Sequence, residues 1–429
     1  MEGTRLPKST PQDADVLIVG AGPAGTSLAS HLAGAGVDAL VLEKATFPRV
    51  KACGDGLTPR AVKELALLGV RTPASEGWIK VKGLRVFGGG HALELPWPEL
   101  DSFPNYGLTL PREDLDHRLA RHAKAKGARL EEGVTVTAAL RHPGTGRVVG
   151  VKARTKQGER HYRAAVVVDA GGVAARVATS VGRTAQPTRP LGTAVRVRVK
   201  LPAAPGPDRL EWLESHLELR DSRGLMPGYG WVFPVAGNQL NVGVGAVSRS
   251  ARTKQGNGRE LLGRWLATLE QCWGFSQQDV VERPIGAALP MAFSRQPMYA
   301  GGLVLLGDAA GMVSPFDGEG VAYAMQSARF AAEAIAEAIT RPTPNTRERA
   351  LRVYPARMKQ DLGGYFSLGR VFVYLIEHPR VMHLCTTYGL PRPTLMRLVN
   401  KLISDMYEPR GGDWMDRLIA TAARLAPAA

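Results

Sequence analysis

The glycine-rich turn at residues 20–25 constrains the fold of this chain more than any other segment. The surrounding stretch, residues 15–44, reads DVLIVGAGPAGTSLASHLAGAGVDALVLEK, and its apolar run leads directly into the turn. In such a turn Gly20 permits the tight bend, Gly22 lets the backbone approach a pyrophosphate, and Gly25 lets helix and strand pack closely. We therefore expect a strand, a glycine turn and a helix of small residues in that order.

A second apolar strand, residues 39–42, follows that helix and ends in Glu43. The Glu43 carboxylate is placed to accept hydrogen bonds from ribose hydroxyl groups, and the helix N-terminus offers unpaired N–H groups to phosphates. Strand, turn, helix and acidic residue at this spacing predict a Rossmann-like dinucleotide-binding unit. Its expected dinucleotide contacts are Gly20, Gly22, Pro23, Ala24, Gly25, Glu43 and Lys44.

A second glycine-containing segment, residues 302–329, favours FAD over NAD as the dinucleotide. It reads GLVLLGDAAGMVSPFDGEGVAYAMQSAR: a strand (residues 303–306) ending in Gly-Asp, a loop and an alanine-rich helix. This arrangement resembles the p-hydroxybenzoate hydroxylase-like flavoproteins, in which the aspartate meets the ribityl chain and the helix N-terminus faces the flavin ring. The resemblance implies FAD contacts at Gly307, Asp308, Pro315, Gly318, Gly320 and Val321, with Glu319 beside the ring.

Two other segments bear on the cofactor. Residues 110–119, LPREDLDHRL, resemble an Arg-containing helix start of that class, which implies that Arg112 lies near the ribityl chain or pyrophosphate; a solvated helix position is the alternative. Residues 169–174, DAGGVA, follow a strand and depart from the class, which often has Ala-Asp-Gly with a Ser two residues later. Because relatives use this segment for both FAD and nicotinamide, the departure weakens the expectation of the usual NADPH docking.

The chain between the two flavin motifs shows strand periodicity. Residues 194–201 (AVRVRVKL) and 216–220 (HLELR) alternate in the manner of a half-buried sheet. Residues 228–245, GYGWVFPVAGNQLNVGVG, hold aromatic residues at alternate positions, and alternate residues of a strand share one face. An aromatic stripe is therefore expected, with ordinary core packing as the alternative. The expected substrate-side residues are Tyr229, Trp231, Phe233, Pro234, Gly243 and Gly245.

Three motifs together resemble the geranylgeranyl reductase family over residues 14–340: KACGDGLTPRAV, YGWVFP and GDAAGMVSPFDGEG. Within the family, SHLELR and PGYGWVFP look most like the actinobacterial menaquinone-reducing branch. The resemblance implies that the aromatic stripe lines a prenyl channel and that the Cys-Gly-Asp-Gly loop lies beside the flavin. It further implies that Arg49 and Lys51 serve FAD phosphates. The loop residues Cys53, Gly54 and Asp55 would lie at the cofactor, Gly56 would allow close approach to the ring, and Pro59 would begin a helix.

The implied function is saturation of an isolated C=C bond in an isoprenoid chain, with FAD as cofactor and NADPH, NADH or another reductant as electron donor. The alkene takes a hydride at one carbon and a proton at the other, and aromatic faces and exclusion of water favour the cation character that develops. Cys53 and Tyr229 are the candidate catalytic residues. A buried hydrophobic role for Cys53, a loop-shaping role for Asp55 and a flavin-bound water as proton source remain open.

The alternative function is an FAD-dependent monooxygenase acting on an aromatic or prenylated small molecule. A halogenase is disfavoured because YGWVFP has a single Trp where that class has a paired-Trp motif. A lipid carrier is a third class, and it would need no redox cofactor.

Composition limits the partners and the compartment. The formal charge of +16 comes without a nucleic-acid recognition motif, so nucleic acid is not expected as a partner. The charge indicates either a basic, Arg-rich surface or an anionic lipid surface as the partner. Three distant cysteines argue for a reducing cytosol, and neither a secretory signal at residues 1–15 nor a bilayer-spanning apolar run is present in the sequence. We expect a cytoplasmic protein, peripheral to the cytoplasmic membrane; no metal site and no oligomeric state are predicted.

The expected fold is α/β, with a Rossmann-like FAD-binding domain (1–77, 106–187 and 283–340) interleaved with an antiparallel β-sheet substrate domain (78–105 and 188–282). A C-terminal helical region (341–429) follows a proline-marked linker. In it, residues 394–406 place Leu395, Leu398, Val399, Leu402 and Ile403 on one helical stripe, with Arg397 and Lys401 on other faces. That stripe either packs on the body or attaches to a membrane, with Lys or Arg toward the headgroups.

Overall fold

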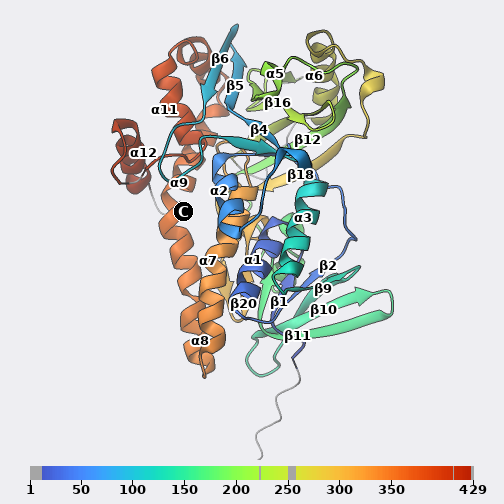
Figure 1. Cartoon of the computed structure of the whole chain (residues 1–429). Helices are drawn as coiled ribbons and strands as arrows, with labels where there is room; N and C mark the ends of the chain where they lie inside the picture. The colour runs from blue at the N-terminus through green and yellow to red at the C-terminus, as the bar shows by residue number, and fades with distance from the viewer. Residues whose placement is uncertain (1–11, 222–223, 250–257, 409, 427–429) are drawn as a thin grey trace, which may run out of the picture.

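The computed structural model describes residues 12–221, 224–249, 258–408 and 410–426. Within this part of the chain, two large sheets lie at opposite ends of the molecule, and long helices run along one side of both (Figure 1). Residues 1–11, which contain most of the segment used to argue against a secretory signal, lie outside the described residues.

The first sheet carries the glycine turn and has the strand order β19-β20-β11-β1-β2-β8. Its strands are β1 (Ala14–Val19), β2 (Ala39–Glu43), β8 (Arg129–Glu132), β11 (Gly158–Asp169), β19 (Tyr299–Ala300) and β20 (Leu303–Leu305). All neighbours pair in parallel except β19 with β20, so the expected Rossmann-like core is confirmed. The strands β9 (Thr135–Arg141) and β10 (Val148–Thr155) extend antiparallel from the first half of β11.

Three helices cover this sheet and share its core. They are α1 (Pro23–Gly34), α3 (Arg112–Ala125) and α7 (Val321–Thr340), and α1 packs against both of the others. The short α4 (Arg176–Ser180) packs on β9. The buried strands are near-continuous apolar runs because helices cover the parallel sheet.

The second sheet has the order β18-β12-β17-β16-β13-β5-β6. Its strands are β5 (Gly83–Gly88), β6 (His91–Pro96), β12 (Leu191–Lys200), β13 (Trp212–His216), β16 (Gly228–Val235), β17 (Gln239–Ser248) and β18 (Ile285–Pro290). It is antiparallel apart from the β13–β5 pair, and α6 (Gly258–Trp273) packs on β12 and β17. The expected boundary at residue 283 falls ahead of β18, yet β18 pairs with β12, so we propose that the substrate domain extends to Pro290.

Small elements join the two sheets. A three-stranded sheet, β3-β7-β4, consists of β3 (Gly56–Leu57), β7 (Gly107–Thr109) and β4 (Ile79–Val81), and α2 (Pro59–Leu68) starts at Pro59 as expected. Near the second sheet lie α5 (Pro207–Leu210) and the hairpin of β14 (Arg220–Asp221) and β15 (Gly224–Leu225).

The strand expected at residues 216–220 is wrong. Only its two end residues belong to strands, and Glu218 between them has φ +63°. Its carboxylate accepts hydrogen bonds from the N–H of Gly89 (2.8 Å) and from the Thr386 hydroxyl (2.5 Å). The chain bends here to join the β5–β6 turn to the C-terminal helices, a tertiary demand that the alternating pattern does not reveal.

The C-terminal helices are α8 (Pro344–Leu351), α9 (Val353–Ile376), α10 (Pro379–Leu384), α11 (Pro393–Ile403) and α12 (Trp414–Leu425), with a π-helical turn at Cys385–Gly389. Helix α9 packs against α7, and its buried face shares the core of the first sheet. Among the described residues, no helix is both long and apolar enough to span a bilayer.

Helix α11 corrects one sequence expectation. Lys401 is buried, 8% exposed, and its ammonium group donates to Asp413 (2.9 Å) and Asp416 (2.8 Å), so it does not reach toward lipid headgroups. Of the apolar stripe only Leu395 is exposed; Leu402 and Ile403 pack against the core. The stripe faces mainly the protein body because the chain after α11 turns back into it.

Candidate functional site

The glycine turn forms an open anion-binding corner at the N-terminus of α1. A Cβ on Gly20, which has φ +98°, would lie 2.6 Å from the Ala170 carbonyl oxygen, and one on Gly25 would overlap the Gly20 carbonyl. At Gly22 the nearest atom would instead be an Arg49 guanidinium nitrogen, 3.9 Å away. The helix begins here without a side-chain cap, so its N–H groups face an accessible space next to a cation.

Glu43 lies against this corner. Its Oε2 accepts from the Ala21 N–H (2.8 Å), its Oε1 accepts from the Ala45 N–H (3.0 Å), and Arg49 Nε lies 3.6 Å from Oε1. Arg49 also pairs with Asp116 on α3 at 3.1 Å. The carboxylate is thus fixed beside the turn, whereas the neighbouring Lys44 is exposed.

The downstream flavin motif meets the first one in space. A Cβ on Gly307 (φ +50°) would lie 3.4 Å from the Ala24 Cβ, and one on Gly320 would lie 3.2 Å from Asp308 Oδ1. Helix α7 starts at Val321 without a side-chain cap, like α1. Two uncapped helix N-termini donate N–H groups, an open glycine leaves space, and two flanking carboxylates accept hydrogen bonds. A dinucleotide needs this combination, so the residues fit FAD.

The Asp169 segment has a structural explanation. Asp169 is fully buried at the end of β11, and its carboxylate accepts from the N–H groups of Gly171 (3.0 Å) and Ala178 (2.9 Å). Burial raises the pKa of Asp169, and these two hydrogen bonds oppose the rise. These hydrogen bonds hold the Asp169 carboxylate against its own turn and against α4.

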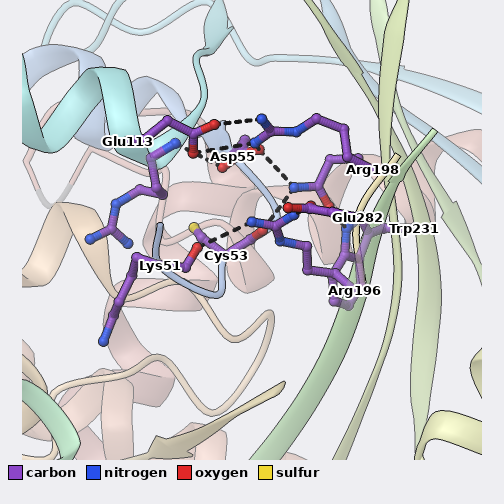
Figure 2. Close-up of polar contacts among 10 residues, drawn as sticks. Lys51, Cys53, Asp55, Glu113, Arg196, Arg198, Trp231 and Glu282 are labelled. Atoms are coloured by element: carbon purple, nitrogen blue, oxygen red, sulfur yellow. Dashed lines mark hydrogen bonds and ion pairs between the residues drawn. The ribbon is translucent and has the colours of Figure 1, made fainter. Parts of the chain in front are cut away.

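Asp55, in the Cys53–Gly56 loop, joins this loop to three elements (Figure 2). It is 1% exposed and has φ +64°. Oδ1 accepts from the Arg112 N–H at the start of α3 (3.0 Å), while Oδ2 accepts from Arg198 on β12 (3.0 Å) and from the Asn241 amide on β17 (2.8 Å). Burial raises the pKa of Asp55, against the lowering effect of Arg198.

Buried basic residues surround this loop. Arg198 also pairs with Glu113, and Arg196 pairs with Glu282 and donates to the Lys51 carbonyl oxygen (3.4 Å) (Figure 2). Although the alternation in β12 suggests a half-exposed face, Arg196 is only 1% exposed. Burial lowers its pKa, and Asp55 acts in the opposite direction.

Arg112 is held away from solvent by its own helix. Its guanidinium donates twice to Asp116, at 2.8 and 3.0 Å, and it is 6% exposed. Burial acts to lower the pKa of Arg112, but Asp116 and then Cys53 raise it above its ordinary value. A solvated helix position, the alternative considered from the sequence, is therefore excluded.

The aromatic stripe is present on β16. Ring centroids of Tyr229 and Trp231 lie 6.1 Å apart, and those of Trp231 and Phe233 lie 6.3 Å apart. A Cβ on Gly54 or Gly56 would lie 3.1–3.2 Å from the Phe233 ring, so the Cys53–Gly56 loop closes directly over the stripe. A Cβ at either loop position would force the Phe233 ring to shift by a few tenths of an ångström, so glycine favours this close contact.

Other neighbours fix the stripe from behind and from the side. Trp231 Nε1 donates to Asn241 Oδ1 (2.9 Å), and a Cβ on Gly243 would overlap the Trp231 ring. At the other end, the Tyr229 hydroxyl donates to the Asp317 carbonyl oxygen (2.6 Å) in the loop before α7. Pro234 is buried, and Gly245 lies beside the Trp231 ring. The stripe thus touches both segments that the resemblance places at the flavin.

The remaining expected residues lie at the edges of this site. Pro315 packs against Gly369 on α9, Gly318 lies near Leu289 on β18, and the Lys51 ammonium lies near Gly172. The three cysteines form no disulfide; Cys53 is half-buried, and Cys272 and Cys385 are exposed.

Comparison with known proteins decides the family. Residues 13–351 match the FAD binding domain family. The chain is 35% identical over 412 residues to a menaquinone reductase of Mycobacterium tuberculosis, covering 96% of this chain and 95% of that protein. It is an FAD-dependent oxidoreductase of the geranylgeranyl reductase family.

One further relative of this geranylgeranyl reductase family member and one solved structure with a similar fold extend the comparison. A digeranylgeranylglycerophospholipid reductase of Methanopyrus kandleri is 30% identical over 361 residues, with 83% of this chain and 88% of that protein covered. The fold matches the crystal structure of a geranylgeranyl bacteriochlorophyll reductase-like protein from Thermoplasma acidophilum, with a TM-score of 0.72, 22% identity and coverage of 91% and 99% of the two chains.

Sequence reasoning missed several residues of this family member's site. They are Thr58, Arg60, Glu113, Arg196, Arg198, Asn241, Glu282, Asp317 and Asp405. The alternating Arg residues of β12 and the two acids of the PFDGEG loop were visible signals. Asn241 lies within residues 228–245 but is not one of the aromatic or glycine positions, and Asp405 lies in a segment without a motif.

Proposed function

We propose that this enzyme saturates one isolated C=C bond of an isoprenoid chain, as in a menaquinone-like quinone or a geranylgeranyl lipid. The observation that carries the proposal is the aromatic stripe of Tyr229, Trp231 and Phe233, which lies between the Cys53–Gly56 loop and the loop before α7. Relatives named as menaquinone and digeranylgeranylglycerophospholipid reductases support the same substrate class.

In this proposal the chain's residues bind, orient and exclude water. The α1 N-terminus, Arg49 and Glu43 would hold the pyrophosphate and ribose of FAD, and Asp308 with the α7 N-terminus would hold its ribityl side. Bound FAD, once reduced, supplies the hydride. The aromatic faces would hold the apolar chain and favour the developing cation, while the closed loop keeps water out.

Cys53 and Tyr229 remain the proposed catalytic side chains. The Cys53 thiol lies near the Arg112 guanidinium, and its backbone carbonyl accepts from Asn241 (2.8 Å). Burial raises the pKa of Tyr229 above its ordinary value, and Asp317 and Glu319 add to the rise, so its hydroxyl stays protonated. A neutral phenol can orient the loop before α7 through its hydrogen bond.

The test is anaerobic turnover with dithionite-reduced enzyme and a menaquinone, followed by mass spectrometry of the product. The product is reoxidised in air before analysis, so that any quinol head group returns to the quinone. A gain of two hydrogens that remains in the isoprenoid tail is expected, whereas a requirement for O₂ with a gain of one oxygen would instead identify the monooxygenase. The Phe233→Ala variant should raise KM by about tenfold or more because burial of one aromatic side chain is lost, while FAD binding persists. Val281→Ala, an exposed position elsewhere, is the control.

The electron donor is proposed to be NADPH or NADH. Rapid mixing of oxidised enzyme with each nucleotide under argon should bleach the flavin absorbance with one of them. Reduction by neither would point to a different reductant for the same oxidised cofactor.

We also propose peripheral attachment to the cytoplasmic membrane through the C-terminal helices. Exposed apolar side chains on these elements are Val371, Tyr374, Leu375, Leu384, Tyr388, Leu395, Trp414, Leu418 and Leu425. Exposed arginines interleave with them: Arg370, Arg380, Arg392, Arg397, Arg417 and Arg424. Such a mixture suits anionic lipid, which attracts the basic groups while apolar side chains insert.

Vesicle sedimentation tests this attachment. Binding to phosphatidylglycerol vesicles but not to phosphatidylcholine vesicles is expected, and the Leu418→Asp variant should weaken it, whereas Val281→Asp should not. Equal sedimentation of both variants, with no effect of salt, would refute the proposal.

A further inference from the structure

Glu319 is a carboxylic acid enclosed where the loop before α7 meets α2. Its Oε2 accepts a hydrogen bond from the Thr58 hydroxyl (2.7 Å). Its Oε1 is out of contact with solvent and has no hydrogen-bond partner. Among the described residues, no ion pair reaches this carboxyl group. A buried carboxyl oxygen without a partner is costly when it is charged.

The charges around Glu319 favour its neutral form. A second acid, Asp317, lies two residues away and accepts the Glu319 N–H (3.1 Å). The nearby Arg60 forms an ion pair with Asp405, with 2.7 Å between a guanidinium nitrogen and Oδ2. Burial raises the pKa of Glu319, and the charge of Asp317 raises it further, since two neighbouring carboxylates resist joint ionisation. The other ionisable groups facing this loop are Tyr229 on β16, Tyr323 on α7, Tyr365 on α9 and Asp405 after α11.

The position of the loop connects this acid to the reaction. Tyr229 of the aromatic stripe donates to the Asp317 carbonyl, so the loop borders the proposed prenyl site. The same loop runs into the uncapped N-terminus of α7, where the residues fit FAD. The charge of Glu319 also acts on Tyr229, so its carboxyl group lies near the hydroxyl end of the aromatic stripe, on the loop that leads to the proposed flavin site.

We propose that Glu319 donates the proton that completes saturation of the C=C bond, with Thr58 and Asp317 as positioning residues. This inference rests on the proposed function. The π bond breaks, the hydride supplied by reduced FAD forms one C–H bond, and the proton of Glu319 forms the other. Glu319 is left as a carboxylate that keeps the Thr58 hydrogen bond, and after the product leaves it takes a proton back from water through the half-buried Thr58 hydroxyl. FAD is left oxidised.

Infrared difference spectroscopy tests the proton itself, apart from turnover. Wild-type holoenzyme should show the carbonyl stretch of neutral carboxylic acids at neutral pH, and Glu319→Gln should lose part of this band, because other buried acids such as Asp405 also contribute to it. The matched control is Glu337→Gln, at an exposed ion pair near the far end of α7, which should keep the band. Persistence of the whole band in Glu319→Gln would overturn the inference.

Kinetics test where the proton goes. Formation of the tail-saturated product by dithionite-reduced Glu319→Gln with a menaquinone should be slower by about 100-fold or more, the usual loss when a general acid is removed, with FAD bound at wild-type stoichiometry. If wild type turns over and Glu319→Gln is equally fast, only this inference fails. If wild type itself reduces no isoprenoid, the proposed function fails, and the assignment of Glu319 as donor fails with it.

A second variant covers the case in which Glu319→Gln does not fold. Thr58→Val keeps the side-chain shape, and Thr58 makes no side-chain cap to α2. Losing the hydrogen bond to Oε2 should shift the carboxylic acid band and slow turnover by about tenfold. An unshifted band with an unchanged rate would contradict the positioning role.

Discussion

The two ends of the site are built in different ways. At the dinucleotide end, the Glu43 carboxylate bonds Ala21, only 22 residues away, within one strand–helix–strand unit. At the ring end, Asp55 bonds Asn241 across 186 residues, Thr58 bonds Glu319 across 261, and Arg60 bonds the Asp405 carbonyl across 345. The first end is a local motif, whereas the second is assembled by the whole fold.

This difference predicts where the protein is vulnerable. The dinucleotide end depends on the absence of side chains at its glycines, which lets backbone segments approach each other and leaves room for the expected phosphates. The ring end depends on buried charged groups that each need an oppositely charged or hydrogen-bonding partner. Removal of one such partner lowers the free energy of unfolding more than loss of one surface contact does.

The largest effect should come from breaking the ring end at Asp55. Asp55→Ala removes the buried acceptor shared by Arg198, Asn241 and the Arg112 N–H, so the free energy of unfolding should fall by about 3–5 kcal/mol. Chemical denaturation measures this change. Asp38→Ala, which removes an exposed pair with Arg129, should cost about 0–1 kcal/mol. If both variants lost a similar free energy of unfolding, the ring end would not depend on buried charges more than the rest of the protein does.

The ring end should also respond to pH. Burial raises the pKa of Asp405 from 3.8 to about 7, with Arg60 opposing the rise. The folded state therefore binds this proton more tightly than the unfolded state between these values, so the free energy of unfolding should fall as pH rises through this window. The loss from pH 5 to 7 should be about 2–3 kcal/mol. Denaturation at each pH should give a flatter dependence for Asp405→Asn than for wild type.

A smaller effect is expected from filling the glycine turn. Gly25→Ala would overlap the Gly20 carbonyl, so unfolding free energy should fall by about 1–3 kcal/mol and FAD should be lost on gel filtration. Gly34→Ala, in the same helix and with open space around it, should retain FAD. Retention of FAD by both variants would show that the turn tolerates a side chain.

The smallest effect should follow from neutralising Glu43. Glu43→Gln keeps the shape but weakens the charged hydrogen bonds, so the Kd for FAD should rise by about tenfold with little change in unfolding of the apoprotein. Fluorescence titration of apoenzyme with FAD measures it. A loss of stability as large as that of Asp55→Ala would mean that Glu43 serves the fold rather than the cofactor.

The sequence alone determined the parts whose geometry is local. The glycine turn, the strand ending in Glu43, the helix beginning at Pro59 and the aromatic stripe follow from residue spacing, because one strand or one helix turn sets their geometry. The cofactor class and the family follow from the same motifs.

Only the tertiary structure decided which remote groups meet. It buried Arg196 in a sheet whose alternation suggested an open face, turned Lys401 toward Asp416, and bent the chain at Glu218 where a strand was expected. It also placed Glu319 against Thr58. Such pairings depend on how sheets and helices pack across hundreds of residues, and no periodicity within a single segment encodes the partner of a buried charge.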